Sequence, residues 1–305
     1  MFYFANLTGS RYTRHMSLVF IVNAKASRVQ RKMHQLENSI ASLFPTAKVL
    51  PLKKPTDLAK TIHHVMKEKP RTIVLVGGDG TVISGIDILK QKGYNGKIGI
   101  IPLGTANYLA RNIGTPLDLD EALTRIKRGR TRDVRFGQAN GTLFSLFAGI
   151  GFTTKISQHV SVTLKQKTGQ LAYIVEGFRQ FKDARHFTYD ITTDGTRDTL
   201  HGKAHQILIA NADLSHQLPV APSTSISRAS MMLTIYTSKS KIRLILSLLL
   251  YIFSLGRVKT NIQTYRITKA RIKTSPMQKF SLDGEVFDAE PVDVTISEDA
   301  VKLII

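Results

Sequence analysis

The chain has 305 residues, more than one hydrophobic core usually serves, so its length predicts two domains. Apolar residues make up 42% and charged residues 21%, as in ordinary globular proteins, and the lack of cysteine excludes disulfides and thiolate metal sites. Lysine and arginine number 43 against 22 acidic residues, and the net charge of +21 predicts an anionic partner, either nucleic acid or an anionic lipid surface. No nucleic-acid-binding motif accompanies this charge.

Strand-like and helix-like stretches alternate through the first half of the chain. Residues 1–15 hold aromatic residues but no long apolar core behind a basic start, so they do not predict a secretory signal. The spacing of apolar residues predicts strands at 17–22, 48–52, 72–76 and 97–101, and helices at 27–44, 58–66, 82–89 and 119–126. We therefore expect an α/β domain with a doubly wound parallel sheet.

Gly77, Gly78, Asp79, Gly80 and Thr81 follow the buried strand 72–76, where it turns into a helix. Without Cβ atoms these glycines can adopt positive φ and let backbone N–H groups approach a ligand, with the positive end of the helix dipole behind them. Such a turn favours phosphate, and Asp79 within it suits a hydrated Mg²⁺ or a substrate hydroxyl beside a nucleotide. The alternative is that the glycines form only a tight strand–helix turn.

A second passage from strand through glycine to helix follows at Pro102–Arg111. Gly104, Thr105 and Asn107 come directly after the strand 97–101, and a small hydroxyl residue at this place is typical of a helix N-cap. Two such passages, each at the carboxyl end of a strand, are what a doubly wound sheet needs to form one ligand crevice.

After Asp133 the sequence changes to short strands joined by turns. Strands are predicted at 134–138, 143–148, 187–193, 205–211, 232–237 and from 258 onward, with one helical insert near 171–181. This pattern predicts a mainly antiparallel β-sandwich. We place the boundary between residues 132 and 133, which gives a nucleotide-binding domain of residues 1–132 and a β-sandwich domain of residues 133–305.

Two stretches bear on membrane contact. Residues 125–132 are densely basic, which is typical of a solvated helix end, with contact to lipid headgroups as the alternative. Residues 241–255 form the most apolar run but are too short for a spanning helix, which needs about 20 apolar residues. We expect a buried helix there, and a helix at the membrane interface is the second interpretation.

Three motifs occur in a specific order: Gly77–Thr81, then Pro102–Thr105 with Asn107, then Leu282–Glu285. Together they resemble the diacylglycerol kinase catalytic family, especially its bacterial lipid kinase branch, which is related to the sphingosine kinases. The first motif alone is shared with NAD kinases and, loosely, with phosphofructokinases. The resemblance implies a phosphofructokinase- or NAD kinase-like first domain and a second domain that supplies the lipid side of an interdomain cleft.

The resemblance also implies ATP and Mg²⁺ as cofactors, with Asp79 on the metal. The residues that it assigns to nucleotide binding are Asn23, Gly77, Gly78, Asp79, Gly80, Thr81, Gly104, Thr105 and Asn107.

The third motif contains two candidate catalytic carboxylates. Asp283 and Gly284 lie between strand-like runs, and the hairpin turn that this dipeptide favours is enough to explain them, but not Glu285. In the resembling family the glutamate of this motif is the general base. We therefore expect Glu285 to take the proton of a lipid hydroxyl as it attacks the γ-phosphorus, with Asp283 supporting Mg²⁺ or orienting that hydroxyl. With Asp79, these residues make up the expected catalytic set.

The chain departs from the family pattern at several positions. Residues 227–231 stand where the family has an Asp-Gly pair whose aspartate helps to hold a structural metal in some relatives, so we predict that this metal is absent. The other departures replace polar or backbone-restricting family residues near the nucleotide: Ala24, Leu52, Ile83, Ser84 and Tyr108, while Arg228 lies in the replaced pair.

These observations predict an ATP-dependent lipid kinase that phosphorylates a hydroxyl of diacylglycerol or a related lipid in an interdomain cleft. We expect a cytoplasmic protein, peripheral at the anionic inner face of the membrane, with no nucleic acid as partner. An NAD kinase is an alternative enzyme, although Pro102–Thr105 with Asn107 argues against it. The third interpretation, favoured by the departures, is a catalytically weak binding protein of the membrane surface with a kinase fold.

Overall fold

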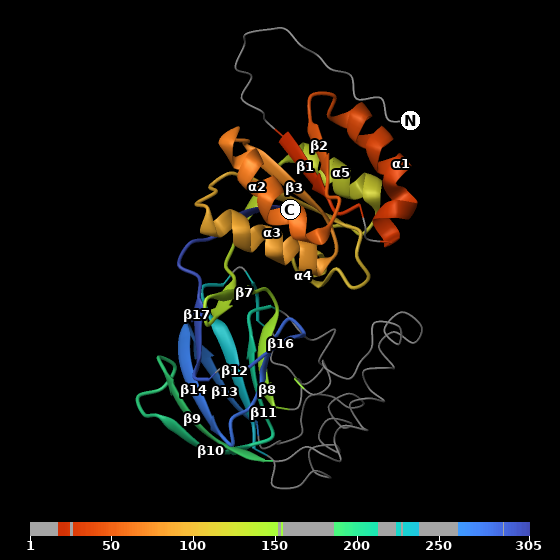
Figure 1. Cartoon of the computed structure of the whole chain (residues 1–305). Coiled ribbons are helices and arrows are strands. Elements are labelled where there is room, and N and C mark those ends of the chain that lie inside the picture. Colours follow the sequence, from red (N-terminus) through yellow and green to blue (C-terminus); the bar gives the residue numbers. More distant parts are fainter. Residues whose placement is uncertain are drawn as a thin grey trace, which may run out of the picture.

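The structure is a computed structural model that describes residues 18–24, 27–151, 154, 186–212, 224–226, 228–237, 262–288 and 290–305. The chain up to residue 134 and the last strand, residues 301–304, form an upper α/β layer, and an antiparallel β-sandwich lies beneath it (Figure 1). The tail at 1–15, the insert expected near 171–181 and the apolar run 241–255 lie outside the described residues.

The predicted parallel sheet is confirmed. Its strands run in the order β2-β1-β3-β4-β18-β5, and β2, β1, β3 and β4 are parallel neighbours. The elements of this part of the chain are β1 (Leu18–Val22), α1 (Ser27–Leu43), β2 (Lys48–Pro51), the 3₁₀ turn η1 (Pro55–Asp57), α2 (Leu58–Lys67), β3 (Thr72–Gly77), α3 (Asp79–Gln91), β4 (Lys97–Pro102), α4 (Tyr108–Asn112) and α5 (Leu119–Arg128).

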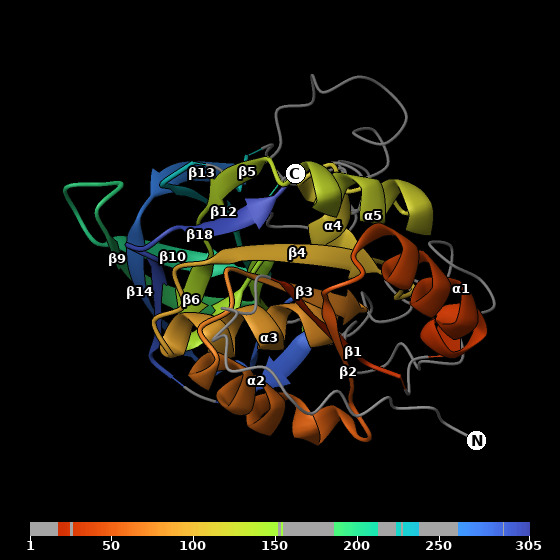
Figure 2. The same cartoon turned by 90° about the horizontal axis from the view of Figure 1, so that it is seen from above.

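Helices cover both faces of this sheet, which explains why its strands are continuous apolar runs. α2 and α3 pack on one face against residues such as Ile73 and Leu75, and α1 and α5 pack on the other against Val74 and Val76. Figure 2 shows the two helix pairs on opposite sides of β4.

The C-terminal strand returns to the first sheet. β18 (Val301–Ile304) is parallel to β4 and antiparallel to β5 (Thr131–Val134). A cut after residue 132 assigns β18 to the second domain, so on this point the expected division needs correction. The physical reason is that β4 would otherwise carry a long, exposed edge, which β18 and β5 cover.

The predicted β-sandwich is also confirmed, as two antiparallel sheets of six strands each around a shared core that includes Ile150, Ile191, Ile209 and Leu233. The first sheet contains β10 (Leu200–Ala204), β9 (Phe187–Thr193), β14 (Lys269–Ser275), β17 (Val292–Ile296), β6 (Gly137–Ala139) and β7 (Thr142–Phe144). The second contains β13 (Ile262–Ile267), β12 (Met231–Tyr236), β11 (Gln206–Ala210), β8 (Phe147–Gly151), β15 (Phe280–Leu282) and β16 (Glu285–Phe287).

The strand predicted at 143–148 is two strands in different sheets. β7 ends at Phe144 and β8 begins at Phe147, so Ser145 and Leu146 form the turn where the chain crosses between the sheets. We call residues 145–147 the crossover turn. Both Ser145 and Leu146 are buried. The apolar run therefore continues through this turn, and in the sequence it looks like one strand.

One apolar cluster joins the two domains. We call its joining part the interdomain core, with Val82, Ile86, Leu109, Ala110 and Ile113 from the first domain and Phe136, Leu143, Leu146, Leu208 and Ala210 from the second. Side-chain packing therefore holds the sandwich against α3 and α4, above β7 in Figure 1. Within the described ranges, no helix has the length and apolar character that a membrane crossing requires.

Candidate active site

The two glycine passages lie next to each other at the carboxyl edge of the parallel sheet. Gly77 at the end of β3 pairs in register with Pro102 at the end of β4, and Leu103 N donates to Gly77 O at 2.9 Å. Loops that are far apart along the chain thus meet at one edge, as the doubly wound topology predicts.

Close approach of the backbones explains two of the glycines. A Cβ on Gly104 would lie 2.4 Å from Gly78 Cα, so a side chain there is excluded without movement of the loops. The freedom to adopt positive φ is not used here, because neither Gly77, Gly78 nor Gly80 has positive φ, and Gly78 is extended with φ −91°. A Cβ on Gly80 would meet no atom within 4 Å, so crowding does not require glycine at this position and the space beside it is open.

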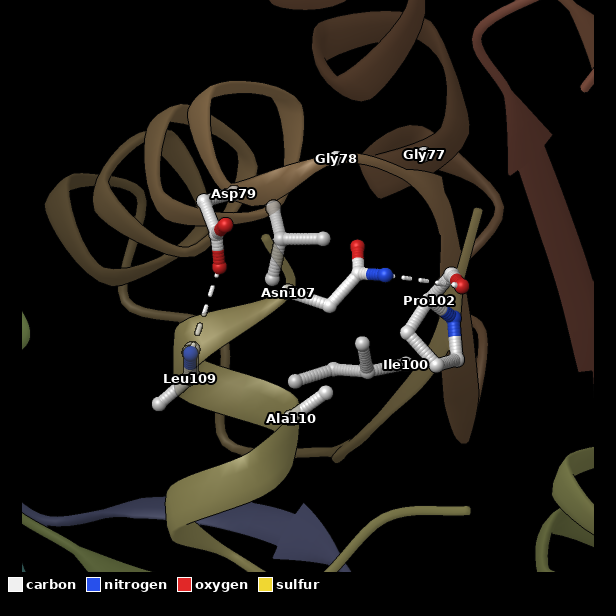
Figure 3. A pocket seen from close by; sticks show the side chains of 9 residues that line it. Gly77, Gly78, Asp79, Ile100, Pro102, Asn107, Leu109 and Ala110 are labelled. Carbon is white, nitrogen blue, oxygen red and sulfur yellow. Dashed lines mark hydrogen bonds between the residues drawn. The ribbon is translucent and has the colours of Figure 1, made fainter. Parts of the chain in front are cut away.

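Asn107 is turned into its own loop. It is left-handed, with φ 52°, and buried. Its Nδ2 donates to Gly104 O at 2.9 Å and to Pro102 O at 3.3 Å (Figure 3), and its Oδ1 accepts from Gly104 N at 2.8 Å. Its amide therefore shapes the loop that faces a ligand.

Asp79 links the two passages. Its Oδ1 accepts a hydrogen bond from Leu109 N at 3.2 Å, in the first turn of α4 (Figure 3). Burial raises the pKa of Asp79, and backbone hydrogen bonds from Leu109, Tyr108 and Asn107 partly oppose that rise. A cation close to this carboxylate would favour its ionised form.

The donor set around Asp79 fits Mg²⁺ that arrives with a nucleotide. In the part of the chain that the structure describes, no cluster of three or more His, Cys, Asp or Glu side chains could hold a metal by itself. Mg²⁺ is commonly bound by one or two carboxylates together with substrate phosphates. A single carboxylate at the mouth of the glycine passages matches that pattern.

The first loop joins the site through Asn23. Its Nδ2 donates to Thr81 Oγ1 at 2.8 Å, and its backbone N–H donates to Val76 O at 3.0 Å. Asn23 and Thr81, assigned to the nucleotide by motif, are thus brought together at the start of α3. Thr105 is exposed on the loop before α4.

Two arginines at this edge were missed by the motifs. Arg28 Nη1 donates to Gly104 O, and Arg111 Nε donates to Ala106 O, each at 3.0 Å. Both side chains are exposed, and neither forms an ion pair with a described carboxylate. A basic residue in the first helical turn after Asn23 was the signal that could have identified Arg28.

The pocket between the passages is small. It is lined by residues 77–79, Pro102, Asn107 and the start of α4, which leave almost no free space even for a water molecule (Figure 3). The pocket therefore does not by itself hold a ligand group in this structure.

The acidic motif forms the predicted hairpin. β15 and β16 pair with Leu282 opposite Glu285, and both turn residues have positive φ, 49° at Asp283 and 96° at Gly284. Positive φ at both central residues is typical of the type I′ turn that Asp-Gly favours.

Asp283 is bound into its own domain. Its Oδ2 accepts from Ser145 N at 2.7 Å and Ser145 Oγ at 2.9 Å, and its Oδ1 accepts from Leu146 N at 2.8 Å and Phe147 N at 3.0 Å. Burial raises the pKa of Asp283, and these hydrogen bonds partly oppose the rise. Both oxygens are thus engaged by the crossover turn.

Glu285 is exposed at the start of β16, and its side chain forms no hydrogen bond or ion pair with the rest of the described chain. The crossover turn that holds its hairpin contributes Leu146 to the interdomain core. The hairpin consequently lies at the end of the sandwich that meets the first domain.

Family models match both halves of the chain. The model described as "Diacylglycerol kinase catalytic domain" matches residues 17–139, and "YegS C-terminal NAD kinase beta sandwich-like domain" matches residues 147–305. The chain belongs to the diacylglycerol kinase catalytic family. The three motifs had indicated this family. The names of the family and of its members indicate a lipid-kinase-like transferase.

This chain is also similar to individual proteins, among them diacylglycerol kinases. The diacylglycerol kinase of Bacillus subtilis strain 168 is 35% identical over 124 residues, which cover 40% of this chain and 41% of that protein. An uncharacterized protein of Synechocystis is 28% identical over 304 residues, covering 94% of this chain and 69% of that protein. A crystal structure of a diacylglycerol kinase from Bacillus anthracis has a TM-score of 0.73 at 21% identity, covering 95% and 96% of the two chains, and shows likeness of fold.

Three departures from the family pattern are explained by packing. Leu52 is buried in the cluster that contains the interdomain core, and Ile83 and Tyr108 are partly buried against it. Apolar contact has replaced polar side chains at these positions. Arg228, by contrast, is exposed.

Proposed function

We propose that this protein is an ATP-dependent lipid kinase that transfers the γ-phosphate to a hydroxyl of diacylglycerol or a related lipid. The observation that carries the proposal is the contact of the two glycine passages, with Asp79 at their junction, in a chain of the diacylglycerol kinase family.

The first domain would hold the nucleotide phosphates. Gly80, in the first turn of α3, has open space beside it, and a helix N-terminus favours anions. Arg28 would add charge from the side of Gly104, since only one of its donors is used there. Mg²⁺ bound at Asp79 would supply neutralisation of the phosphate charge.

The second domain would activate the acceptor. In the proposed step the lipid hydroxyl oxygen forms a bond to the γ-phosphorus, the bond from that phosphorus to the bridging oxygen breaks, and ADP leaves. The hydroxyl proton passes to Glu285, whose exposed carboxylate has no competing partner in the described chain. The reaction would take place in the cleft between the domains.

We further propose that the protein works as a peripheral protein at an anionic, cytoplasmic membrane face. The net charge of +21 supports this because basic proteins accumulate at anionic lipid surfaces.

A second candidate is a weakly catalytic protein that binds the membrane surface. The observations that favour it are the small pocket and the apolar packing of Leu52, Ile83 and Tyr108, where the family has polar residues near the nucleotide or, at Ile83, just after the glycine motif. The absence of those polar side chains would lower nucleotide affinity without disturbing the fold.

An acceptor panel tests the proposal. The full chain is incubated with γ-labelled ATP and Mg²⁺, with separate arms for diacylglycerol in anionic vesicles, other lipids with a free hydroxyl, NAD, and vesicles alone. Label in a lipid product supports the proposal, and label in NADP would identify an NAD kinase. If ATP and Mg²⁺ raise the melting temperature but no acceptor is labelled, or if neither occurs while vesicles are bound, the kinase assignment is wrong.

A further inference from the structure

We infer that Asp283 is a positioning residue: it fastens the hairpin that carries Glu285 to the crossover turn, and it contacts neither metal nor substrate. The inference rests on the proposed role of Glu285 and replaces the expectation that Asp283 supports Mg²⁺ or orients the hydroxyl.

The first step is the saturation of the Asp283 carboxylate. Each oxygen accepts two hydrogen bonds from the crossover turn, at 2.7–2.9 Å for Oδ2 and 2.8–3.0 Å for Oδ1. Hydrogen bonds to an ionised group are stronger than neutral ones, and breaking them leaves buried N–H groups unpaired. A metal ion would have to displace these donors to reach Asp283.

The second step is that the crossover turn is itself fixed from behind. Asn211, fully buried, donates its backbone N–H to Leu146 O at 2.7 Å and its side-chain Nδ2 to Ser145 O at 3.2 Å and Arg135 O at 3.0 Å. Both the N–H and the carbonyl sides of the turn are therefore bound. Asp283 is thus attached to a rigid part of the sandwich.

The third step connects this anchor to the first domain. Leu146 of the crossover turn and Leu109 of α4 both belong to the interdomain core, and Leu109 N is the donor to Asp79. Asp79 and Asp283 thus each bind backbone N–H groups of elements that meet in one apolar core. Since Glu285 lies two residues after Asp283, its place relative to the glycine passages depends on this anchor.

The test uses Asp283→Asn and Asp283→Ala, with Asp288→Asn as the control. Asparagine tolerates the left-handed backbone of the turn and keeps one acceptor oxygen, so this variant should fold even if alanine does not. Asp288 is exposed near the same hairpin and pairs only with exposed Lys279, so its loss should change little.

A positioning role predicts a specific split of readouts. The stabilisation of the Asp283→Asn variant by ATP and Mg²⁺ and its KM for ATP should stay within about twofold of the unmodified protein, because the nucleotide loops are untouched. Its kcat for lipid phosphorylation should fall by up to about 10²-fold, the effect of a small misplacement of a reacting group. Amide hydrogen exchange at Leu146 and Phe147 should become faster, while the Asp288→Asn control leaves it unchanged.

Two outcomes would overturn the inference: unchanged exchange at Leu146 and Phe147, or loss of the ATP and Mg²⁺ response in an Asp283→Asn protein that is folded. The second would make Asp283 a nucleotide or metal ligand. If the unmodified chain phosphorylates no lipid, the proposed function fails, but the exchange and nucleotide-response measurements still decide the role of Asp283.

Discussion

At the scale of single residues, the buried carboxylate of Asp79 lowers stability but is needed for the proposed function. It connects α3 to α4 by accepting a hydrogen bond from Leu109 N, and it is also the carboxylate that the proposed function assigns to Mg²⁺. Burial of a charge without a nearby cation costs stability, and strain of this kind is often retained at functional sites.

The raised pKa of Asp79 gives a pH-dependent prediction. Because burial raises the pKa of Asp79 in the folded state above its ordinary value of 3.8, the folded protein holds this proton more tightly than the unfolded chain. Below the unfolded pKa both states are protonated and there is no cost; as pH rises through the folded pKa, ionisation lowers stability. Asp79→Asn should therefore melt higher than the unmodified protein near about pH 7, and the gap should close toward about pH 4. A gap in melting temperature that widens on acidification would contradict this reading.

The glycine contact gives a matched pair of variants. Gly104→Ala should destabilise the protein by about 1–3 kcal/mol, since its Cβ would lie 2.4 Å from Gly78 Cα. Gly80→Ala, in a helix with no atom within 4 Å of the new Cβ, should be neutral or stabilise by up to about 1 kcal/mol. Chemical denaturation of both variants measures the difference. Equal effects on the free energy of unfolding would show that the close approach is not what requires glycine at 104.

Single residues also show where sequence reasoning succeeded and where it stopped. The motifs identified residues that the fold brings to one edge, such as Gly78, Gly104 and Asn23. They did not reveal that Asn107 bonds to its own loop or that Arg28 reaches Gly104 O, because both depend on side-chain direction. Nor did they show that crowding, rather than positive φ, requires glycine at 78 and 104.

Among the elements, β18 has a role that no local pattern predicts. Its short apolar sequence reads as one more strand of the sandwich, yet it pairs between β4 and β5 of the first sheet. Apolar periodicity gives the type of an element but not its partner, since pairing is decided by which sheet edge remains uncovered. The same limit explains why the predicted strand at 143–148 is divided between two sheets.

β18 yields a test of this long-range pairing. Leu303 is fully buried in the first domain's cluster, so Leu303→Ala should lower the free energy of unfolding by about 2–5 kcal/mol. Lys302→Ala on the same strand is exposed and should stay within about 0.5 kcal/mol. Because β18 completes the sheet that carries the proposed nucleotide site, the ATP and Mg²⁺ response should weaken in the first variant and persist in the second. A Leu303→Ala protein with unchanged stability would contradict the pairing.

At the scale of the whole molecule, the two domains share an apolar core. The sequence predicted both folds and the motifs of the site. It could not predict this core, because residues such as Leu109, Leu146 and Leu208 are unremarkable apolar positions until the domains are placed together. That core sets how the two domains are placed, so in the proposed reaction the distance between nucleotide and acceptor groups would depend on packing rather than on any single motif.

The joint action of both domains is tested most directly by the rate of γ-phosphate transfer to lipid in Glu285→Gln, beside Glu298→Gln as the charge-matched control. Glu298 is exposed on a turn near the C-terminus, and its substitution should leave the rate unchanged. Glu285→Gln should lose about 10²–10⁴-fold, the usual contribution of a general base, while ATP and Mg²⁺ still stabilise it as they do the unmodified chain. Full transfer by the Glu285→Gln protein would contradict the account.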